Sequence, residues 1–327
     1  MKTQAEEFNL IEKYFLPLTN GVSGAFNLKD DAASLNLPPS QSLIVTSDAL
    51  VESVHFLASD SPQDIAAKIL SVNLSDLAAM GAKPFSYNLI FGASKDINEQ
   101  WIKLFSNSLA IEQKKYSISL IGGDIVRSKG PLFLGITAMG FLENGTELRR
   151  SGAKFKDDVW VSGLIGDGAA GLKVAQGELK VDDKSDEFYL LSQYRRPVPR
   201  VDLGLKLKGI ANATIDVSDG LISDLAHICR SSKLGATVSL DAVPISKALG
   251  KVIKADKNYY NLVLCGGDDY ELLFTANKSY YHDILNISRI LEIPITKIGE
   301  LNEYSGVNVL NTDDFIYDIK ESGYSHF

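Results

Sequence analysis

The run Ser42-Leu43-Ile44-Val45-Thr46-Ser47-Asp48 is short and apolar, and it predicts a strand that ends in an aspartate. The run from Ile118 to Asp124 repeats the pattern, as do the runs that end at Asp216 and Asp268. Carboxylates gathered at strand ends repel one another unless cations are bound between them. The pattern therefore indicates hard divalent metals, which most often neutralise phosphates.

The composition limits the classes of protein to consider. With 327 residues, of which 45% are hydrophobic and 23% charged, the chain is expected to form two globular domains. A net charge of −8 argues against a nucleic-acid partner, because such binders need a basic surface. The two cysteines have no metal-binding spacing, the first residues are polar, and no apolar run approaches a bilayer span. These features predict a soluble, cytoplasmic protein without a membrane partner.

Turn and cap signals divide the chain. Ser61-Pro62 and Gly81 predict the start and stop of a helix from about Pro62 to Met80, and a second helix is expected from about Asn98 to Tyr116. The polar stretch from Glu143 to Asp158 predicts a domain boundary. We therefore expect one domain over residues 1–145 and another over residues 146–327.

Asp76 falls on the apolar side of the first of these helices. At 100° per residue it lies within about 60° of Ile65, Ile69 and Val72, whereas Lys68 lies on the polar side. A carboxylate on a buried stripe is costly unless it is paired or metal-bound. The alternative is an aspartate bonded to a neighbouring backbone group, but the pattern favours metal ligation.

A single strand-end aspartate is more often a turn or helix-cap residue. The recurrence of the pattern at Asp48, Asp124 and Asp216, with Asp31 and Asp76 beside it, favours a shared cation site. Magnesium prefers oxygen ligands and keeps waters, so aspartates with the hydroxyls of Thr46 or Ser47 suit it better than zinc. Gly122-Gly123 would also let a phosphate approach the backbone closely, although the same pair is common in tight turns.

Several ordered motifs resemble the thiamine-monophosphate kinase family, within the aminoimidazole-ribonucleotide synthetase-like superfamily. They span almost the whole chain. They are Asn73 to Ala82, Gly122-Gly123-Asp124, Arg150 to Ala153, Arg196 to Arg200, Ile215 to Leu221, Gly266 to Leu272, and the ending Gly323-Tyr324-Ser325-His326-Phe327. The segment from Asp48 to Phe56 and this ending are the parts most specific to the kinase.

The resemblance implies a phosphotransferase that uses ATP to convert thiamine monophosphate to thiamine diphosphate. It implies an α+β fold of two domains: an N-terminal mixed sheet with helices, which binds ATP and magnesium and forms a homodimer, and a C-terminal α/β domain that completes the substrate site. No general base is expected, because the substrate phosphate already offers an anionic oxygen as nucleophile. In agreement with this expectation, the sequence shows no recognisable Ser/His/Asp nucleophile arrangement and no His/Cys spacing typical of a zinc site.

The resemblance also assigns roles residue by residue. It implies that several magnesium ions are held by Asp31, Thr46, Ser47, Asp48, Asp76, Asp124, Asp216 and Asp219. It implies ATP contacts from Gly123, Asp124, Arg150 and Ser218, and contacts to thiamine monophosphate from His55, Asp268 and Tyr324.

The chain departs from the family pattern at two places. Asn27-Leu28-Lys29 precede Asp30-Asp31 where the family usually has Gly-x-Gly, and Asp268 stands where the family tends to have glutamate. Two other functions remain alternatives: another ATP-dependent synthetase of the same superfamily, or a non-catalytic divalent-cation-binding protein. The synthetases that act on selenide would be expected to carry a reactive cysteine near the N-terminus, whereas the first cysteine here is Cys229.

Overall fold

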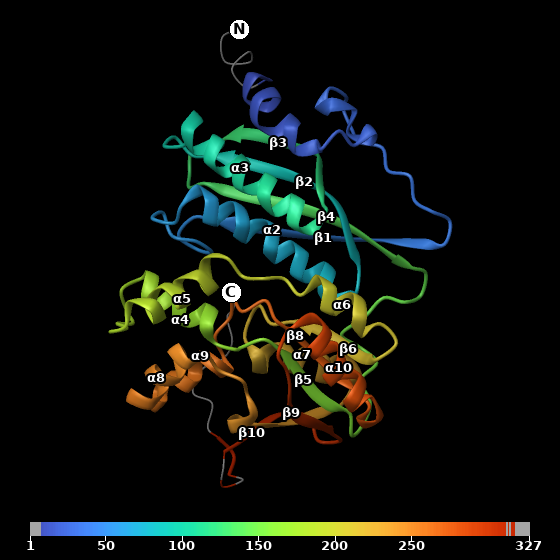
Figure 1. Cartoon of the computed structure of the whole chain (residues 1–327), viewed down its shortest axis with the longest axis vertical. Coiled ribbons are helices and arrows are strands. Elements are labelled where there is room, and N and C mark those ends of the chain that lie inside the picture. The colour runs from blue at the N-terminus through green and yellow to red at the C-terminus, as the bar shows by residue number, and fades with distance from the viewer. Residues whose placement is uncertain (1–7, 312, 314, 318–327) are drawn as a thin grey trace. The chain divides into compact units, whose positions relative to one another are not determined.

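The computed structural model describes residues 8–311, 313 and 315–317, so Tyr324 lies outside the described residues (Figure 1). The chain forms two compact units. The first comprises Met1–Leu77 and Ala82–Gly145, and the second comprises Ala78–Gly81 and Thr146–Phe327. Each unit contains its own sheet and helices, which confirms the predicted α+β class.

The first unit is built on a four-stranded mixed sheet with the order β1-β4-β2-β3. β4 runs antiparallel to β1 and β2, and β2 runs parallel to β3. The helices α2 and α3 lie on one face of this sheet (Figure 1). The bounds are β1 (Gln41–Val51), β2 (Lys83–Ala93), β3 (Ser119–Arg127), β4 (Phe133–Glu143), α2 (Pro62–Ala79) and α3 (Glu99–Tyr116).

The two predicted helices are confirmed, and their cap residues explain where they begin. The hydroxyl of Ser61 accepts a hydrogen bond from the backbone N–H of Asp64 at 3.1 Å, and Pro62 occupies the first helical position. At α3, the side chain of Asn98 accepts from the backbone N–H of Trp101 at 2.9 Å. Gly81 ends α2 with a φ of +68°, a conformation that glycine adopts at little cost.

The sheet of the first unit has a buried face and a partly exposed face. On the helix-covered face, Tyr87, Phe91 and Leu134 are fully buried, and Phe91 packs edge-on against Phe105. On the other face, Val45 is 54% exposed and Ile90 is 47% exposed. This alternation is the period of two expected for strands with one covered face.

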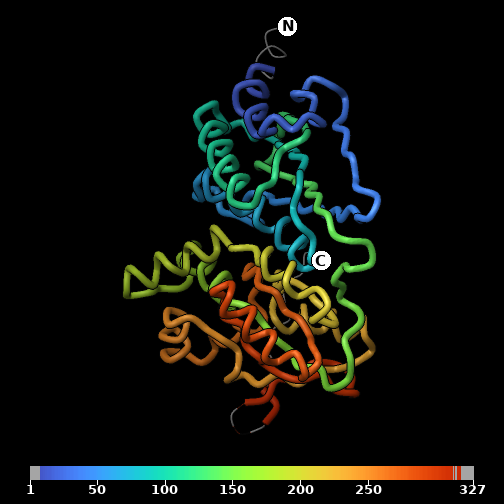
Figure 2. Tube along the Cα trace, turned by 45° about the vertical axis from the view of Figure 1, so that its right-hand side comes forward, coloured from blue at the N-terminus to red at the C-terminus, as the bar shows by residue number. Residues whose placement is uncertain are grey.

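Short helical turns precede β1. η1 (Ile11–Phe15), η2 (Leu16–Thr19) and η3 (Ser23–Leu28) lie near β3, and residues 29–40 then run as a long irregular connection along the outside of the unit to β1 (Figure 2). Ala25 packs with Ile121 and Met139, so this segment covers one end of the partly exposed sheet face.

The second unit contains a six-stranded sheet with the order β10-β7-β9-β5-β8-β6, in which only β10 and β7 pair in parallel. The strands are β5 (Asp158–Ser162), β6 (Ala211–Asp216), β7 (Gly235–Ser239), β8 (Leu272–Ala276), β9 (Ile295–Asn302) and β10 (Gly306–Leu310). The helices are α4 (Asp167–Ala175), α5 (Lys184–Arg195), α6 (Val201–Leu207), α7 (Leu221–Ser232), α8 (Lys247–Ala255), α9 (Tyr260–Leu264) and α10 (Tyr281–Leu291), with short turns η4 (Leu240–Ala242), η5 (Lys257–Tyr259) and η6 (Lys278–Tyr280). Every residue of β5 and β8 is buried, so these two strands form the centre of the unit.

The prediction that each aspartate ends a strand is correct at Asp216 and wrong elsewhere. β1 continues three residues beyond Asp48, because its pairing with β4 extends to Val51 opposite Phe133. β3 likewise continues past Asp124 to Arg127, paired with β2. The apolar run before Asp268 is the short helix α9, since a run of four apolar residues does not distinguish a strand from a buried helical turn.

Arg200 and Glu271 form a buried ion pair in the second unit. The guanidinium donates to both carboxylate oxygens, and its Nε lies 2.6 Å from Oε2 of Glu271. The side chain of Glu271 is only 7% exposed, and it also accepts from the Ser162 hydroxyl at 2.5 Å. Arg200, the last residue of the Arg196 to Arg200 motif, is therefore engaged by a buried carboxylate.

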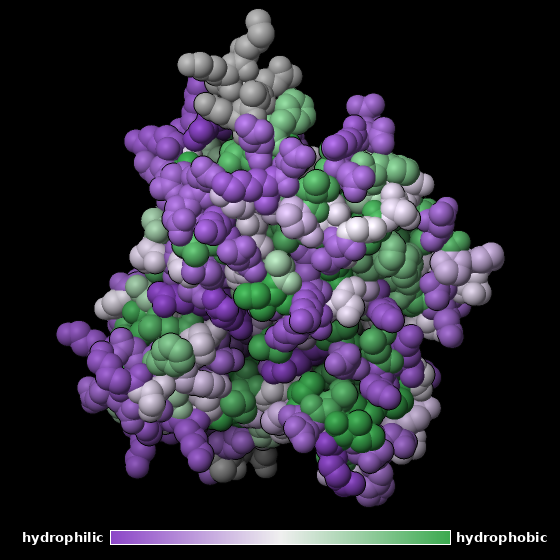
Figure 3. Space-filling view, turned by 45° about the horizontal axis from the view of Figure 1, so that its top comes forward, coloured by the Kyte–Doolittle hydropathy of each residue, from purple (hydrophilic) through white to green (hydrophobic). Residues whose placement is uncertain are grey.

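On the face of the molecule drawn in Figure 3, hydrophobic residues gather in small groups between hydrophilic ones. Among the described residues, no helix combines the length and hydrophobicity needed to cross a membrane. Cys229 and Cys265 are both buried.

We expect Arg200→Ala to lower the free energy of unfolding by about 3–5 kcal/mol, because it leaves the Glu271 carboxylate buried without its counter-ion. The matched control is Lys184→Ala, which removes an ion pair with Glu187 whose lysine is 88% exposed; this change should cost less than about 1 kcal/mol. Urea denaturation of the full chain measures both values. Equal losses in the two variants would contradict the importance of the buried pair.

Candidate functional site

α2 presents polar side chains to β1. The hydroxyl of Thr46 donates to Oδ2 of Asp76 at 2.5 Å, and the backbone N–H of Asp48 donates to Oδ1 of Asn73 at 3.1 Å. Asn73 and Asp76 are three residues apart, so they lie on the same side of the helix. The structure thus brings Thr46, Asp48 and Asp76 together, as the motif assignments require.

Asn73 has a structural role that the sequence did not reveal. Its side chain is fully buried, and its amide donates to the carbonyl of Ile69 at 2.9 Å while its oxygen holds the backbone of Asp48. At 100° per residue Asn73 falls inside the broad apolar arc of α2, and a buried amide in such an arc needs a hydrogen-bond partner. The position of Asn73 in the apolar arc is thus the sequence feature that could have predicted this role.

The helical wheel was wrong about Lys68, which it placed on a polar side. Lys68 is only 2% exposed, because its ammonium donates to the carbonyl of His55 at 3.1 Å. The same turn is held by the imidazole of His55, whose Nδ1 accepts from the backbone N–H of Val51 at 3.0 Å. In neutral His55 the ring proton is therefore on Nε2.

Ser47 and Asp124 lie on the other face of the sheet. Along the register, Asp124 pairs with Ile90, Ile90 with Gly135, and Gly135 with Ala49, the second residue after Ser47. The Ser47 hydroxyl lies 2.8 Å from that of Thr137 on this face. The ligands assigned to the first unit are therefore divided between the two faces of one sheet, a division that strand alternation produces.

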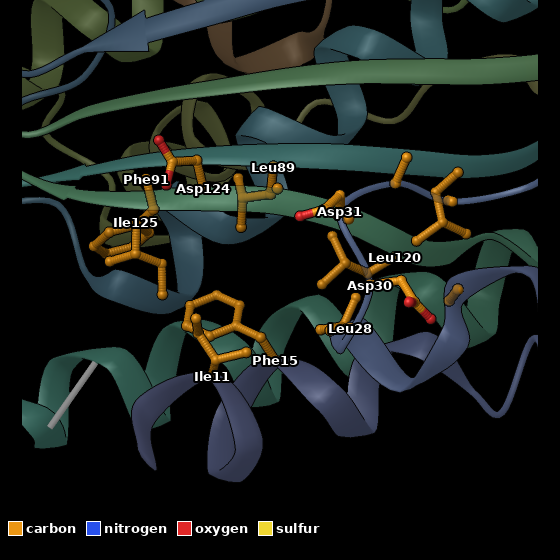
Figure 4. A pocket seen from close by; sticks show the side chains of 16 residues that line it. Ile11, Phe15, Leu28, Asp30, Asp31, Leu89, Phe91, Leu120, Asp124 and Ile125 are labelled. Carbon is orange, nitrogen blue, oxygen red and sulfur yellow. The ribbon is translucent and has the colours of Figure 1, made fainter. Parts of the chain in front are cut away.

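A cavity of about 150 Å³ lies in the first unit between the N-terminal turns and β3, and Figure 4 shows its lining. Its walls are mainly apolar, with Phe15, Leu28 and Phe91 among them, whereas Asp31 and Asp124 are exposed carboxylates of its lining. Gly123 also lines the cavity, and a side chain there would collide with the carbonyl of Leu89 at 2.0 Å. The cavity thus brings together two predicted ATP contacts, Gly123 and Asp124, and two predicted metal ligands, Asp31 and Asp124.

The backbone before Asp30-Asp31 is left-handed although it contains no glycine at these positions. Phe26, Asn27 and Leu28 have φ values of +47°, +57° and +55°. Glycine reaches this region without the steric cost that a side chain adds. Although the Gly-x-Gly pattern of the family is missing, the backbone at residues 26–28 is therefore left-handed.

In the second unit, the loop after β6 carries Ser218 and Asp219. Asp216 is the last residue of β6 and is 4% exposed. One oxygen of Asp224, in the first turn of α7, accepts from the backbone N–H groups of Ser218 and Asp219 at 3.0 and 3.1 Å. Burial raises the pKa of Asp224 to about 7, and these two hydrogen bonds oppose that rise.

The loop with Asp268 packs directly on this segment. The backbone N–H of Asp268 donates to the carbonyl of Ser218 at 3.0 Å, and a side chain at Gly267 would lie 2.2 Å from the same oxygen. Asp268 itself adopts a left-handed φ of +70°, and its carboxylate accepts from the Tyr270 hydroxyl at 3.2 Å. A predicted ATP contact and a predicted substrate contact are therefore neighbours.

Arg150 lies close to the same loop. Its charge lowers the pKa of Asp224, and it also lowers the pKa of His227, for which burial is the larger cause. The backbone N–H of Thr214 donates to the carbonyl of Arg149 at 2.8 Å, which ties this segment to β6. Arg150, Ser218 and Asp219 thus belong to one neighbourhood of the second unit.

The second of the paired aspartates, Asp269, has a separate structural role. Its carboxylate accepts from the backbone N–H groups of Gly166 and Gly168 at 2.7 and 3.0 Å, at the start of α4. Burial, the largest cause, raises its pKa well above the ordinary value. The adjacent aspartates Asp268 and Asp269 are therefore distinguished only by the fold.

In the part of the chain that the structure describes, no three histidine, cysteine, aspartate or glutamate residues are grouped so that they could hold a metal by themselves. The ligands assigned to the first unit lie apart from Asp216 and Asp219 in sequence and belong to a different unit. The metal-ligand assignments therefore stay predictions, and the contact predicted for Tyr324 lies outside the described residues.

Comparison with known proteins identifies both units. Residues 29–142 match the AIR synthase related protein, N-terminal domain, and residues 157–309 match the AIR synthase related protein, C-terminal domain. The thiamine-monophosphate kinase of Salmonella typhimurium is 40% identical over 323 residues, which are 98% of this chain and 98% of that protein.

Solved structures agree with the sequence comparison. The thiamine-monophosphate kinase from Stenotrophomonas maltophilia is 41% identical with a TM-score of 0.81, covering 86% of this chain and 89% of that one. AaThiL complexed with AMPPCP and TMP is 30% identical with a TM-score of 0.79, covering 91% of each chain. The resemblance drawn from the ordered motifs is confirmed, and the chain belongs to the AIR synthase related proteins and, among them, to the thiamine-monophosphate kinase family.

Proposed function

We propose that this protein transfers the γ-phosphoryl group of ATP directly to thiamine monophosphate and so forms thiamine diphosphate. The observation that carries the proposal is the match over nearly the full chain to thiamine-monophosphate kinases, including AaThiL complexed with AMPPCP and TMP. The reaction requires two polyanions to approach each other. Catalysis then depends mainly on positioning and on neutralising charge, and it needs no general base.

Magnesium fits the donors that the structure places together. Thr46 and Asp76 offer a hydroxyl and a carboxylate that already contact each other, and Asp48 is held beside them through Asn73. These are hard oxygen donors, and magnesium usually takes few protein ligands and completes its shell with water and phosphate oxygens. When bound, magnesium would neutralise the phosphates. We assign Asp31, Ser47, Asp124, Asp216 and Asp219 to the same group of ligands.

The ATP contacts are assigned to Gly123, Asp124, Arg150 and Ser218. Gly123 is exposed and lines the cavity, and Arg150 is an exposed guanidinium that suits a phosphate. The contacts to thiamine monophosphate are assigned to His55, Asp268 and Tyr324. The hydrogen bond from the backbone N–H of Val51 to Nδ1 fixes the orientation of the His55 ring.

We further propose that residues 1–145, which contain the first unit, form the domain that binds ATP and magnesium. This domain would pair with a second copy through the partly exposed face of its sheet, and residues 146–327 would complete the substrate site. Val45, Ile90 and Val126 are 54%, 47% and 38% exposed and come from three strands of that face. An apolar face of this kind suits a homodimer. Two buried cysteines suit the reducing cytoplasm, where we place the reaction.

The direct test is to incubate the purified protein with ATP, magnesium and thiamine monophosphate and to follow thiamine diphosphate by chromatography. We expect one ADP for each thiamine diphosphate, and no product when a chelator removes the metal. Magnesium binding without product would favour the non-catalytic alternative. ATP consumption only with an amidine or selenide acceptor would favour another synthetase of the superfamily.

Asp76→Asn should lower kcat by about 100-fold and raise the magnesium concentration needed for half-maximal rate, because it removes a carboxylate charge from the phosphate site. Asp64→Asn, on the first turn of the same helix, is the control and should leave both values nearly unchanged. Initial rates over a magnesium series measure the effect. An unchanged magnesium dependence in Asp76→Asn would show that Asp76 is not a ligand.

Ile90→Glu should convert the proposed dimer to a monomer, because it places a charge in the middle of the apolar sheet face. The control is Ile111→Glu on α3, where the side chain is 67% exposed and lies on an element that covers the opposite face. Light scattering coupled to size-exclusion chromatography reports the mass of each variant. A wild-type protein that is monomeric at all concentrations would refute the dimer.

A further inference from the structure

We propose that Asp224 is a positioning residue that sets the conformation of the Ser218–Asp219 loop for nucleotide and metal binding. The inference rests on the proposed function, in which Ser218 contacts ATP and Asp219 holds magnesium. Asp224 itself is 2% exposed, and the proposed function assigns it no contact with ATP or magnesium. It acts through the backbone of the two residues that do.

The geometry is specific to the loop. A single oxygen, Oδ2 of Asp224, accepts from the N–H groups of both Ser218 and Asp219, at 3.0 and 3.1 Å. The backbone N–H of Asp224 in turn donates to the carbonyl of Gly220 at 3.0 Å. The carboxylate therefore holds the turn between β6 and α7 through backbone groups alone. The side chains of Ser218 and Asp219 take no part in these hydrogen bonds.

The turn has little freedom once these bonds are made. Gly220 has a φ of +118°, and a side chain there would lie 2.7 Å from the carbonyl of Cys265. On the opposite side of the turn, the carbonyl of Ser218 accepts a hydrogen bond from the backbone N–H of Asp268. Loss of the Asp224 oxygen would leave two half-buried N–H groups without their partner and release the turn from one side.

Two substitutions separate the hydrogen bonds from the charge. Asp224→Asn keeps an oxygen that can accept from both N–H groups, whereas Asp224→Ala removes the acceptor. The matched control is Asp157→Ala. Asp157 is a fully buried aspartate of the same unit, and its Oδ2 also accepts from two groups, the N–H of Lys154 and the amide of Asn212, both at 2.8 Å.

The measurements are steady-state kinetics, calorimetric titration with Mg-AMPPCP, and hydrogen exchange of the peptide that covers residues 216–220. In Asp224→Ala we expect the KM for ATP and the analogue Kd to rise about 10-fold, a larger effect than on kcat, with faster exchange of the loop amides. Asp224→Asn should stay within about 3-fold of the wild type. Asp157→Ala should lose thermal stability and keep its affinity for the analogue.

Wild-type affinity and wild-type exchange in Asp224→Ala would overturn the inference, as would an equal loss of affinity in Asp157→Ala. If Asp224→Ala does not fold, Asp224→Glu replaces it, because its longer side chain keeps the charge but displaces the acceptor. A wild-type protein that forms no thiamine diphosphate contradicts the proposed function instead. In that case the exchange of the loop amides still decides the role of Asp224.

Discussion

A carboxylate that is withdrawn from water must be met by hydrogen-bond donors or by a cation, and this requirement organises the second unit. Glu271 is met by Arg200 and Ser162, Asp269 by two backbone N–H groups at the start of α4, and Asp224 by two in the loop after β6. Each of these acids joins segments that are distant in sequence or closes a turn. The Asp219 and Asp268 loops themselves meet through backbone hydrogen bonds, from the N–H of Asp268 to the carbonyl of Ser218 and from the N–H of Tyr270 to the carbonyl of Val217.

The remaining acids are arranged differently, and the difference bears on function. Asp31 and Asp124 are exposed beside a cavity, and Asp76 accepts a hydrogen bond from the Thr46 hydroxyl of β1. Carboxylates at such positions suit a ligand that brings its own positive charge, as a nucleotide does when it arrives with magnesium. The division of labour between structural and ligand-facing acids is thus consistent with phosphoryl transfer by charge neutralisation.

Local signals in the sequence were sufficient for the long helices. Caps at Ser61 and Asn98 and the glycine at Gly81 act within a few residues, so α2 and α3 begin and end almost where they were expected. The same reasoning failed at Asp48 and Asp124, because a strand ends where its partner stops pairing, and the partner is remote in sequence. It also failed at Lys68, whose burial depends on a carbonyl 13 residues away.

The sequence by itself determined the two-part α+β class, the family and the set of acids from which a phosphate site could be built, because motifs and residue types are local properties of the chain. Only the tertiary structure decided which of these acids bind backbone N–H groups and so stabilise turns and helix starts. Asp268 and Asp269 are adjacent and chemically identical, yet one lies beside Ser218 and the other caps α4. The physical reason is that the role of a carboxylate depends on the donors that surround it, and these come from residues far away along the chain.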